Sequence, residues 1–448
     1  MISAESFRTH SLNTATEGEA ITRILAAAIQ AVEPGDAVHR FVRRDGDVLT
    51  ISGRVYDLKS FHHVTLLGIG KASAAMADAL AGILGTRLDS NLVITKHATS
   101  IPHSPLNIIQ ANHPIPGSDS LLAGTKVMEF IAALGPDDLL FCLISGGGSA
   151  LMTAPAEGIS LADLQSLTSV LLACGAGIDE INLLRRRLDR VKGGGIVKLA
   201  NGATIVSLIL SDVVGNPLET IASGPTAPDP TTHQDALAVL EKYKLRKKVP
   251  ASILAALKTG PETPKPDDPI FTRVQNVIVG SNLLAAQAAL KQAQEEGYQP
   301  YLLRTDLQGE ASQVAFESAT FLRQAKKTNT PIPAPACMVA GGETTVTVKG
   351  KGIGGRNTEL ALAAVSELAD FPGVMLITLA TDGEDGPTDA AGAVVTGESY
   401  RRAAGQGLHP GDFLDRNDSY SFFAALDDLL KPGPTGTNVN DLVFLFML

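Results

Sequence analysis

Tryptophan is absent from this chain, and aromatic residues make up only 4% of its 448 positions. Proteins that hold single-stranded nucleic acid stack its bases on aromatic side chains, which are scarce here. The chain carries 37 Lys and Arg against 47 Asp and Glu, a formal net charge of -10, which disfavours a polyanionic partner. We therefore expect no nucleic-acid partner, and an anionic ligand would need a locally basic pocket.

Cysteine is also scarce, and the three residues Cys142, Cys174 and Cys337 lie far apart. Their spacing from histidines matches no zinc site. Cys142 lies within the apolar run 139–144 and is predicted to be buried. The N-terminus has no basic segment followed by an apolar stretch, and no run of about 18 apolar residues occurs. These absences predict a cytoplasmic protein without a signal peptide or a membrane partner.

Short apolar runs that end in glycine are frequent in the first half of the chain. We expect strands at 64–67, 92–95, 139–144 and 204–210, with helices between them. Their apolar residues are continuous instead of alternating, which is typical of strands buried on both faces. The pattern predicts an α/β fold with a parallel sheet covered by helices on both sides.

A proline-rich segment interrupts this pattern at residues 260–269, where four prolines stand among polar residues. Such a segment has little to bury, so it is a linker or a long surface loop. Beyond it we expect strands at 277–279, 343–348 and 374–379. The sequence therefore predicts two α/β domains joined near residues 250–270.

Lys71 ends the first glycine-containing loop, Gly68-Ile-Gly-Lys71, and stands at the start of an alanine-rich helix. Glycine lets a backbone approach a phosphate, and a helix start offers free N–H groups. A lysine is electrostatically misplaced there, which favours a functional role over a solvated surface position. The loop is neither a Walker A motif nor a complete dinucleotide fingerprint, which would need glycine at Thr65 and Ser73, respectively.

Three consecutive glycines follow the strand expected at 139–144, in the segment Ser145-Gly-Gly-Gly-Ser149. Successive backbone N–H groups in such a turn can surround phosphate oxygens, although a merely tight turn is the alternative. A nucleophile elbow is excluded because Leu151 replaces its second glycine.

A basic run, Arg185 to Lys192, precedes another triple glycine, and Asp212 closes the strand expected at 204–210. The basic run is either a solvated helix face or an anion site, and the glycines favour the anion site. Asp212 is placed as a magnesium ligand or a catalytic carboxylate, with turn capping as the alternative.

Two segments of the second half carry further candidates. Residues 350–359 place Arg356 and Asn357 at the start of a helix, and loop 381–389 contains four carboxylates. Clustered carboxylates repel one another unless a cation joins them, which favours metal–phosphate chemistry. Glycine loops, an isolated Lys and Arg, and carboxylates together are the groups that phosphoryl transfer needs.

Ten segments of the chain carry a family resemblance, in the family's order. They are GIGKA, HPIPG, SGGGSAL, RVKGG, SDVVGNP, ASGPT, GGET, GGRNTELAL, TDGEDGPTDAAGA and GPTGTNVNDL. With them the chain resembles the type II glycerate kinases, or glycerate 2-kinases, whose C-terminal half carries the MOFRL signature. The resemblance implies ATP- and Mg²⁺-dependent phosphorylation of D-glycerate at its 2-hydroxyl. It also implies a Rossmann-like doubly wound domain at 1–255, a smaller α/β domain with a mixed sheet at 270–448, and an active site in the cleft between them.

The family's functional Lys and Arg match Lys71 and Arg356, and we predict Asp382 as the third catalytic residue. Asp212 and Asp385 are the predicted metal ligands. The residues predicted to bind substrate or nucleotide are Gly70, Ser145, Gly146, Gly147, Gly148, Ser149, Arg185, Lys192, Ser223, Gly224, Glu343 and Asn357.

The chain departs from the family pattern at Gly117 and Asn216, where the family commonly has Asp, so neither is taken as a metal ligand. Asp189 and Thr358 replace the usual Ser and Gln. The sequence leaves open whether the chain forms a homo-oligomer.

Two other functions are compatible with parts of the pattern. An NAD(P)-dependent hydroxypyruvate or tartronate reductase would need the missing third glycine at Ser73. A non-catalytic protein that binds a phosphorylated metabolite would gain nothing from the acidic loop 382–389.

Overall fold

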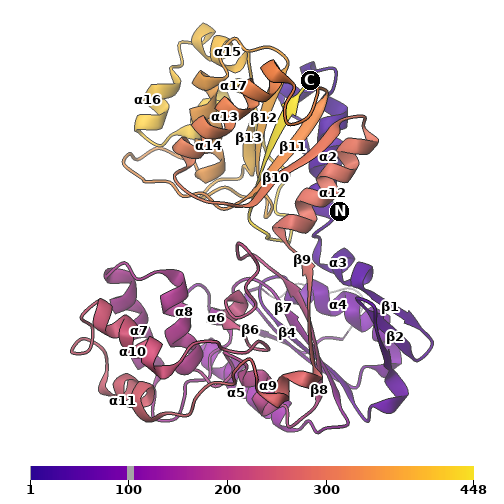
Figure 1. Ribbon diagram of the computed structural model, residues 1–448, viewed down its shortest axis with the longest axis vertical. Helices are drawn as coiled ribbons and strands as arrows, with labels where there is room; N and C mark the ends of the chain where they lie inside the picture. Colours follow the sequence, from indigo (N-terminus) through magenta and orange to yellow (C-terminus); the bar gives the residue numbers. More distant parts are fainter. Residues whose placement is uncertain (1, 98–104) are drawn as a thin grey trace. The chain divides into compact units, whose positions relative to one another are not determined.

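The computed structural model describes residues 2–97 and 105–448, which form two compact units (Figure 1). Residues 34–279 form the parallel-sheet unit, and residues up to 33 together with 280–448 form the mixed-sheet unit. This division differs from the predicted domains 1–255 and 270–448 at both boundaries. The differences have separate causes, which lie in an N-terminal helix and in the proline-rich segment.

The parallel-sheet unit is built on six strands in the order β6-β5-β4-β7-β8-β9. Their bounds are β4 Val64–Ile69, β5 Ser90–Thr95, β6 Ile108–Gln110, β7 Leu139–Ile144, β8 Thr204–Leu210 and β9 Val274–Gly280. The pairs β4/β5, β4/β7, β5/β6 and β7/β8 are all parallel. Numbered along the chain, this is the 3-2-1-4-5-6 order of doubly wound dinucleotide-binding sheets, so the predicted Rossmann-like fold is confirmed.

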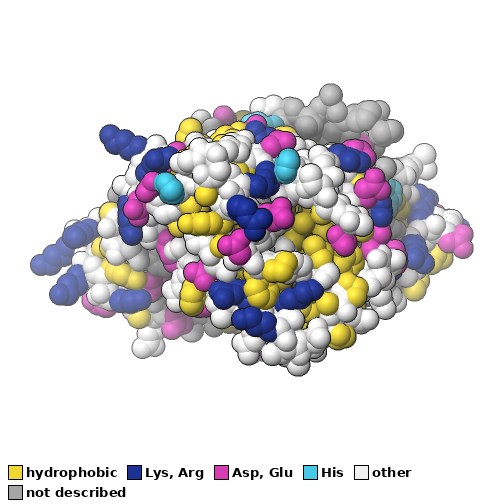
Figure 2. All heavy atoms as spheres, turned by 90° about the horizontal axis from the view of Figure 1, so that it is seen from above, with side chains coloured by type: hydrophobic (Ala, Val, Ile, Leu, Met, Phe, Trp, Pro, Cys, Tyr) yellow, Lys and Arg dark blue, Asp and Glu magenta, His cyan; other side chains and the backbone are white. Residues whose placement is uncertain are grey.

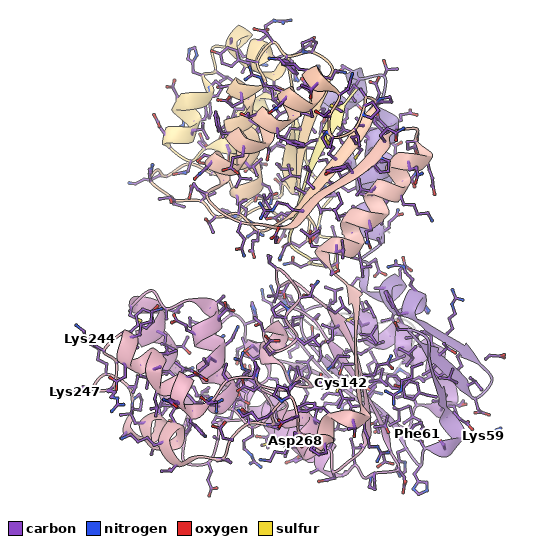
Figure 3. All side chains as sticks on the ribbon, in the orientation of Figure 1. Lys59, Phe61, Cys142, Lys244, Lys247 and Asp268 are labelled. Atoms are coloured by element: carbon purple, nitrogen blue, oxygen red, sulfur yellow. The ribbon has the colours of Figure 1, made fainter. Side chains whose placement is uncertain are left out.

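Helices cover both faces of this sheet, as the continuous apolar strands predict. Helix α4 (Ser73–Leu84) contacts β4, β5 and β7, and helices α5 (Ser118–Ala132) and α9 (Gly195–Leu199) pack on the opposite face. Every residue of β4, β7 and β8 is buried. Cys142 lies within the sheet (Figure 3) and is 0% exposed, which confirms its prediction as a buried residue.

Two smaller substructures complete the unit. Helix α3 (Pro34–Phe41) leads into an antiparallel sheet of β1 (Val42–Asp45), β2 (Val48–Ile51) and β3 (Arg54–Asp57). A helical cluster with its own apolar core contains α7 (Leu161–Ala173), α8 (Ile178–Arg187), α10 (His233–Lys242) and α11 (Ala251–Thr259). Lys244 and Lys247 project outward from it (Figure 3). The short helices are α6 (Gly148–Leu151), η2 (Leu58–Ser60), η3 (Gly85–Arg87), η4 (Ile221–Ser223) and η5 (Pro269–Arg273).

The proline-rich segment 260–269 does not join the two units; it packs within the parallel-sheet unit. The Asp229 amide donates to the Pro264 carbonyl at 2.9 Å, and the Thr263 hydroxyl donates to Asp229 Oδ2 at 2.9 Å. Lys265 pairs with Glu262 at 2.8 Å. The segment is thus held by polar contacts. Because it has little apolar surface to bury, its composition alone indicated a linker.

The mixed-sheet unit contains six strands in the order β10-β11-β15-β12-β13-β14. Their bounds are β10 Gln299–Leu307, β11 Ala336–Gly342, β12 Val374–Ala380, β13 Gly392–Thr396, β14 Leu429–Leu430 and β15 Asp441–Met447. Only β10/β11 is a parallel pair among these neighbours, so the predicted mixed sheet is confirmed. The strand predicted at 343–348 is wrong, because only Thr345 forms an isolated bridge there, with Glu310.

Helices cover this sheet on two sides as well. Helices α13 (Ala311–Thr328) and α14 (Arg356–Glu367) pack into its main core, and α12 (Asn282–Glu295) contacts β10 and β11. Helix α2 (Gly18–Gln30) buries an apolar face and packs against α12 (Figure 1). This contact is the reason that the first 33 residues belong to this unit. The remaining helices are η1 (Ala4–Phe7), α1 (His10–Thr14), α15 (Ser399–Gly405), α16 (Pro410–Asp415) and α17 (Ser419–Leu426).

Charged side chains of both signs are interspersed on the face shown in Figure 2, with apolar side chains between them. In the part of the chain that the structure describes, every helix is too short or too polar to cross a membrane.

Candidate active site

The switch point of the parallel sheet lies between β4 and β7, because the chain winds outward from these neighbours in opposite directions. Ligands of doubly wound sheets bind outside the carboxyl ends of the strands at this point. The two loops there are bound to each other. The Lys71 amide donates to the Gly146 carbonyl at 3.0 Å, and the Ala72 amide donates to Ser145 Oγ at 3.0 Å. The structure thus brings together the two glycine loops that the sequence indicated.

Glycines in the second loop allow other groups to approach its backbone. A Cβ on Gly146 would lie 2.1 Å from Asp212 Oδ2, and one on Gly147 would lie 3.1 Å from His113 Nε2. Gly147 also has a φ of +83°, which a residue with a side chain rarely adopts. Within residues 2–97 and 105–448, the amides of Gly146 and Gly147 donate to no acceptor. They are therefore available for the oxygens of an anionic ligand.

Lys71 and His113 flank this loop and differ in charge. Lys71 is exposed, and among the described carboxylates its ammonium has no ion-pair partner. Burial, together with the charges of Lys71 and Lys96, lowers the pKa of His113 to about 4. The imidazole is therefore neutral at pH 7, and Lys71 supplies the positive charge beside the glycines. His113 was not among the predicted site residues, although the segment HPIPG that contains it is one of the unusual motifs.

Ser149 and Ser223, both predicted binding residues, contact each other through their hydroxyls at 2.8 Å. Ser223 also donates to Asn182 Oδ1 at 3.2 Å. Ala222, Ser223 and Gly224 have φ values of 50°, 61° and 62°, so three successive residues adopt the left-handed conformation. Strained backbone of this kind persists only where neighbours hold it, and it often occurs at binding sites. Here the Gly193 amide donates to the Ser223 carbonyl at 2.9 Å and helps to hold the turn.

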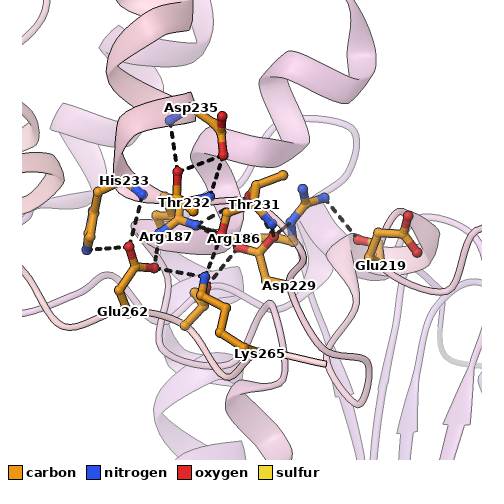
Figure 4. Close-up of polar contacts among 11 residues, drawn as sticks. Arg186, Arg187, Glu219, Asp229, Thr231, Thr232, His233, Asp235, Glu262 and Lys265 are labelled. Carbon is orange, nitrogen blue, oxygen red and sulfur yellow. Dashed lines mark hydrogen bonds and ion pairs between the residues drawn. The ribbon is translucent and has the colours of Figure 1, made fainter. Parts of the chain in front are cut away.

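The basic run separates into paired and unpaired residues. Arg186 and Arg187 are buried and form ion pairs with the buried Asp229, at 3.0 and 3.4 Å (Figure 4). Their contacts make them part of the framework that holds the proline-rich segment. Neither was a predicted site residue.

Lys192, which was predicted to bind substrate or nucleotide, is also buried. Its ammonium contacts Asp189 Oδ2 at 2.5 Å and the Met152 carbonyl at 2.9 Å. Asp189 thus neutralises this lysine. Arg185 differs from its neighbours, because its guanidinium has no hydrogen-bond or ion-pair partner in the described ranges 2–97 and 105–448. Arg185 is therefore the residue of the run that remains a candidate for binding an anion.

In the mixed-sheet unit, Arg356 at the start of α14 is held by two carboxylates. Its Nε and Nη2 contact Asp441 at 2.5 and 3.2 Å, and its Nη1 contacts Glu343 at 2.8 Å. Burial alone would lower the pKa of Arg356, but the hydrogen bond and charge of Asp441 raise it, so the guanidinium stays charged. Burial raises the pKa of Asp441 to about 6 against the opposing contacts of Arg356 and Asn357. Asp441 was missed, although GPTGTNVNDL contains it.

Asp385 caps the first turn of α14. Its oxygens accept hydrogen bonds from the amides of Asn357 and Thr358, at 3.0 and 2.7 Å, and from the Thr358 hydroxyl at 2.8 Å. The residue is 2% exposed. A carboxylate at a helix start satisfies amides that lack intrahelical partners and suits the positive end of the helix dipole. These contacts account for Asp385 without a metal, and we do not carry its metal-ligand assignment further.

The other carboxylates of the acidic loop differ from Asp385. Asp382 is half-buried, and its Oδ1 accepts a hydrogen bond from the Glu384 amide at 3.2 Å. Asp389 accepts from the Tyr420 hydroxyl at 2.7 Å and pairs with Lys431 at 3.3 Å, while Glu384 is exposed. Asp382, Asp385 and Asp389 thus have different partners instead of forming one cluster. Within the described residues, no three or more His, Cys, Asp or Glu gather as a metal site would require.

A magnesium ion that accompanies a nucleotide needs fewer protein ligands than such a cluster. It is commonly bound by one or two carboxylates together with substrate phosphates. Asp212 meets this requirement, because its carboxylate lies against Gly146 in the glycine loop. The donor chemistry present therefore fits a nucleotide-bound Mg²⁺ at Asp212.

Comparison with known proteins identifies relatives over almost the whole chain. Residues 20–258 match a domain of unknown function, DUF4147, and residues 336–441 match the MOFRL family. A glycerate 2-kinase of Pyrococcus horikoshii is 39% identical over 94% of this chain and 95% of its own length. A D-glycerate 2-kinase of Thermotoga maritima is 41% identical over 85% of this chain and 89% of its own length. An Agrobacterium vitis relative, provisionally named a hydroxypyruvate reductase, is 39% identical over 84% and 85%.

Solved structures agree with the sequence comparison. A crystal structure of a Pyrococcus horikoshii protein superposes with a TM-score of 0.86 at 38% identity, covering 96% of this chain and 98% of the other. The Thermotoga maritima glycerate kinase structure gives 0.85 at 38% identity, covering 95% and 98%. The doubly wound sheet with its glycine loops, the mixed-sheet unit and these similarities lead to one conclusion: the chain belongs to the type II glycerate kinase family, with a C-terminal MOFRL domain.

Proposed function

We propose that the protein transfers the γ-phosphoryl group of ATP to the 2-hydroxyl of D-glycerate, giving 2-phosphoglycerate and ADP. The observation that carries the proposal is the loop pair at the β4/β7 switch point, where Lys71 stands beside two glycine amides without an acceptor. Relatives with the names glycerate 2-kinase and D-glycerate 2-kinase support the choice of substrate. A cytoplasmic location belongs to the same proposal, because the three cysteines are free thiols.

The parallel-sheet unit supplies the groups for the phosphoryl donor. The amides of Gly146 and Gly147 bind phosphate oxygens, and the Lys71 ammonium stabilises the charge that develops on them. Asp212 would hold Mg²⁺, which when bound neutralises charge on the phosphates. Gly70 keeps the two loops close, because a Cβ there would lie 2.3 Å from Ser145 Oγ, and Gly148 allows the close approach of Ala222, whose Cβ would lie 2.9 Å from a Cβ on Gly148.

The mixed-sheet unit supplies the groups for the acceptor. The Arg356 fork can bind the carboxylate of glycerate. Glu343 would give up its ion pair with Arg356 to make room, because its side chain is 45% exposed. Asp441 keeps the guanidinium in place. Asp382 accepts the proton of the glycerate 2-hydroxyl while the hydroxyl oxygen attacks the γ-phosphorus. The bond between the γ-phosphorus and the β–γ bridging oxygen breaks, and ADP leaves.

Product NMR tests reaction, substrate and position together. The protein is incubated with MgATP and D-glycerate, and the ³¹P spectrum is recorded with proton coupling. We expect ADP and a phosphate monoester whose phosphorus couples to the single proton on C2. Coupling to the two protons on C3 would show the other regiochemistry, and ADP formation that does not depend on D-glycerate would overturn the proposal. L-Glycerate is the matched control for stereochemistry.

A reductase is the second candidate, favoured by the name of the Agrobacterium vitis relative. The position of Ser73 is relevant to the reductase, because Ser73 stands where the dinucleotide fingerprint has its third glycine. The Ser73 hydroxyl is buried and donates to the Gly70 carbonyl at 2.8 Å and the Ile94 carbonyl at 3.1 Å, so it closes the turn by its side chain. Oxidation of NADH or NADPH by hydroxypyruvate, followed by absorbance, would support the reductase.

A further inference from the structure

A largely apolar cavity of about 130 Å³ lies in the parallel-sheet unit, beside the glycine loop. Its walls come mainly from helices α7 and α8 and include Leu164, Leu167, Leu171, Leu172 and Ile181. A dry apolar cavity of about 150 Å³ accommodates a benzene ring, so this cavity has the size of one planar ring. The proposed function assigns no role to it.

One charged group of the cavity lacks a partner. Arg185 lines the cavity, and its guanidinium forms no hydrogen bond or ion pair within the ranges 2–97 and 105–448. Burial lowers the pKa of Arg185, and the charge of Asp189 opposes this only in part. The adjacent Arg186 and Arg187 both have carboxylate partners (Figure 4). An arginine left in this position is suited to an anionic ligand or to the face of a heterocycle.

A second polar group on the wall is also unsatisfied. Thr153 is 2% exposed, and its buried Oγ1 has no hydrogen-bond partner in the described residues. Buried hydroxyls without a partner are costly, and each one needs an explanation such as a ligand. Gln165 also lines the cavity, and its Nε2 donates to the Pro116 carbonyl at 2.8 Å, which fixes the amide and leaves its Oε1 as an acceptor. The cavity thus offers a hydroxyl and an amide oxygen for the polar edge of a ring.

The cavity shares a wall residue with the segment proposed to bind phosphate. Ser149, which lines the cavity, directly follows Gly148 in that loop. A ring in the cavity therefore lies beside the segment whose amides are proposed to bind phosphate oxygens. Glycerate does not fit this description, because a three-carbon acid with a carboxylate and two hydroxyls offers little apolar surface to these walls.

We propose that the cavity holds one ring of the heterocyclic base of the nucleotide that donates the phosphoryl group. The ring lies between the leucine side chains, Arg185 stacks on it or meets the negative charge of the phosphates, and Thr153 and Gln165 bond its edge. The inference rests on the proposed function for the nature of the nucleotide, but binding can be measured without turnover.

The test fills the cavity from α7. Thr168 lines it and is partly buried, so Thr168→Phe places a ring there. Ser166→Phe is the matched control, because Ser166 lies on the same helix, is exposed and does not line the cavity. Calorimetry measures binding of MgADP and of inorganic tripolyphosphate to both variants and to the unmodified protein. We expect Thr168→Phe to weaken MgADP binding at least about tenfold, the scale of losing one base-stacking contact, and to change tripolyphosphate binding less than about twofold.

Two milder variants keep the test valid if Thr168→Phe does not fold. Thr153→Val removes the unsatisfied hydroxyl, and Arg185→Gln removes the unpaired charge. Each should weaken MgADP binding several-fold. Unchanged MgADP affinity in all three variants would overturn the inference.

Kinetics separate this inference from the proposed function. A rise in KM for D-glycerate with unchanged MgADP binding would make the cavity an acceptor site and overturn the inference alone. If the unmodified protein lacks glycerate kinase activity but Thr168→Phe still weakens MgADP binding, the proposed function fails and the base site stands.

Discussion

The two basic residues at the proposed site, Lys71 and Arg356, are held in opposite ways. Lys71 is exposed and has no carboxylate partner among the described residues, and its neighbour His113 is neutral at pH 7. Arg356 is two-thirds buried by its side chain and already pairs with Asp441 and Glu343, at 2.5 and 2.8 Å. Both stand at the start of a helix, where a cation is electrostatically unfavourable.

This difference indicates two ways to keep a cation at a helix start. Arg356 is fixed by carboxylates, so its fork is oriented before a ligand arrives and part of its charge is already compensated. Lys71 keeps its full charge for the ligand. A group that stabilises charge developing on a phosphoryl group gains from being uncompensated, while a group that positions a carboxylate gains from being rigid. Variants of the two residues should therefore behave differently.

The largest expected effect is on activity in Lys71→Ala. Loss of one donor to developing charge reduces kcat/KM by at least about a hundredfold, close to 3 kcal/mol of transition-state stabilisation. Because Lys71 is exposed and has no ion pair among the described residues, the melting temperature should stay within about 1 °C. Lys198→Ala, at an exposed lysine of the same unit, is the control and should be fully active. A Lys71→Ala protein with more than about half of the normal kcat/KM would remove Lys71 from the site.

Arg356 should affect both activity and stability. Arg356→Ala leaves the buried Asp441 carboxylate without its partner, which costs on the order of 3 kcal/mol in the free energy of unfolding. Adding Asp441→Asn removes the uncompensated charge, so the double variant should regain most of this stability but none of the activity. Arg356→Lys should retain stability better and still lose activity, because an ammonium cannot replace a bidentate fork. Denaturant unfolding and steady-state kinetics check these outcomes, and equal losses of stability in all three variants would contradict the expected pattern.

Asp382→Asn tests the group that receives the proton. Removing a general base typically lowers kcat by about a hundredfold, and nucleotide binding should change little because the side chain acts on the acceptor hydroxyl. Glu384→Gln, in the same loop and exposed, is the control. If the KM for MgATP rises instead and additional Mg²⁺ restores it, Asp382 is a metal ligand, and Asp212 becomes the next candidate for the base.

Much of this arrangement could be predicted from local sequence. The strands β4, β7 and β8 are continuous apolar runs, and the loops after β4 and β7 carry glycines, which indicated both the doubly wound sheet and its ligand-binding edge. What could not be predicted depends on contacts between distant segments. Helix α2 has an apolar face, but nothing local shows that its partner is α12, more than 250 residues later.

The same limit applies to the charges. The basic run looks uniform in sequence, yet Arg186 and Arg187 meet Asp229 while Arg185 does not, because successive positions of helix α8 face different neighbours. The acidic loop shows the same effect. Asp385 faces the α14 amides, and Asp389 meets Tyr420 and Lys431, so adjacent carboxylates acquire unrelated roles.

Asp385→Ala separates the capping role from the metal role that the sequence indicated. Loss of this cap leaves the Asn357 and Thr358 amides without their acceptor and should lower the free energy of unfolding by about 1–2 kcal/mol. The dependence of activity on Mg²⁺ concentration should not move. Glu317→Ala, at an exposed carboxylate within helix α13 of the same unit, provides a control for loss of charge alone. A shifted Mg²⁺ titration with unchanged stability would restore Asp385 as a metal ligand.

His113 should give the smallest effect, confined to mildly acidic pH. Its pKa is lowered from 6.5 to about 4, first by burial and then by the charges of Lys71 and Lys96. Between these two values the unfolded chain binds a proton that the folded protein does not, so the stability contributed by this residue is present above pH 6.5 and is lost as the pH falls toward 4.

His113→Gln removes the titrating group and should flatten this part of the stability curve without changing it above pH 7. Thermal unfolding midpoints of the two proteins at several pH values between 4 and 7 measure the difference. Lys71→Ala offers a sharper version. Removing one of the two cations should raise the pKa of His113 toward 6.5, so the stability lost between pH 6.5 and pH 4 should be smaller than in the original protein. If the curves of the original protein and His113→Gln run parallel from pH 7 to pH 4, the imidazole is not held neutral beside Lys71. The contrast between an uncompensated lysine and a paired arginine would then lose its clearest electrostatic evidence.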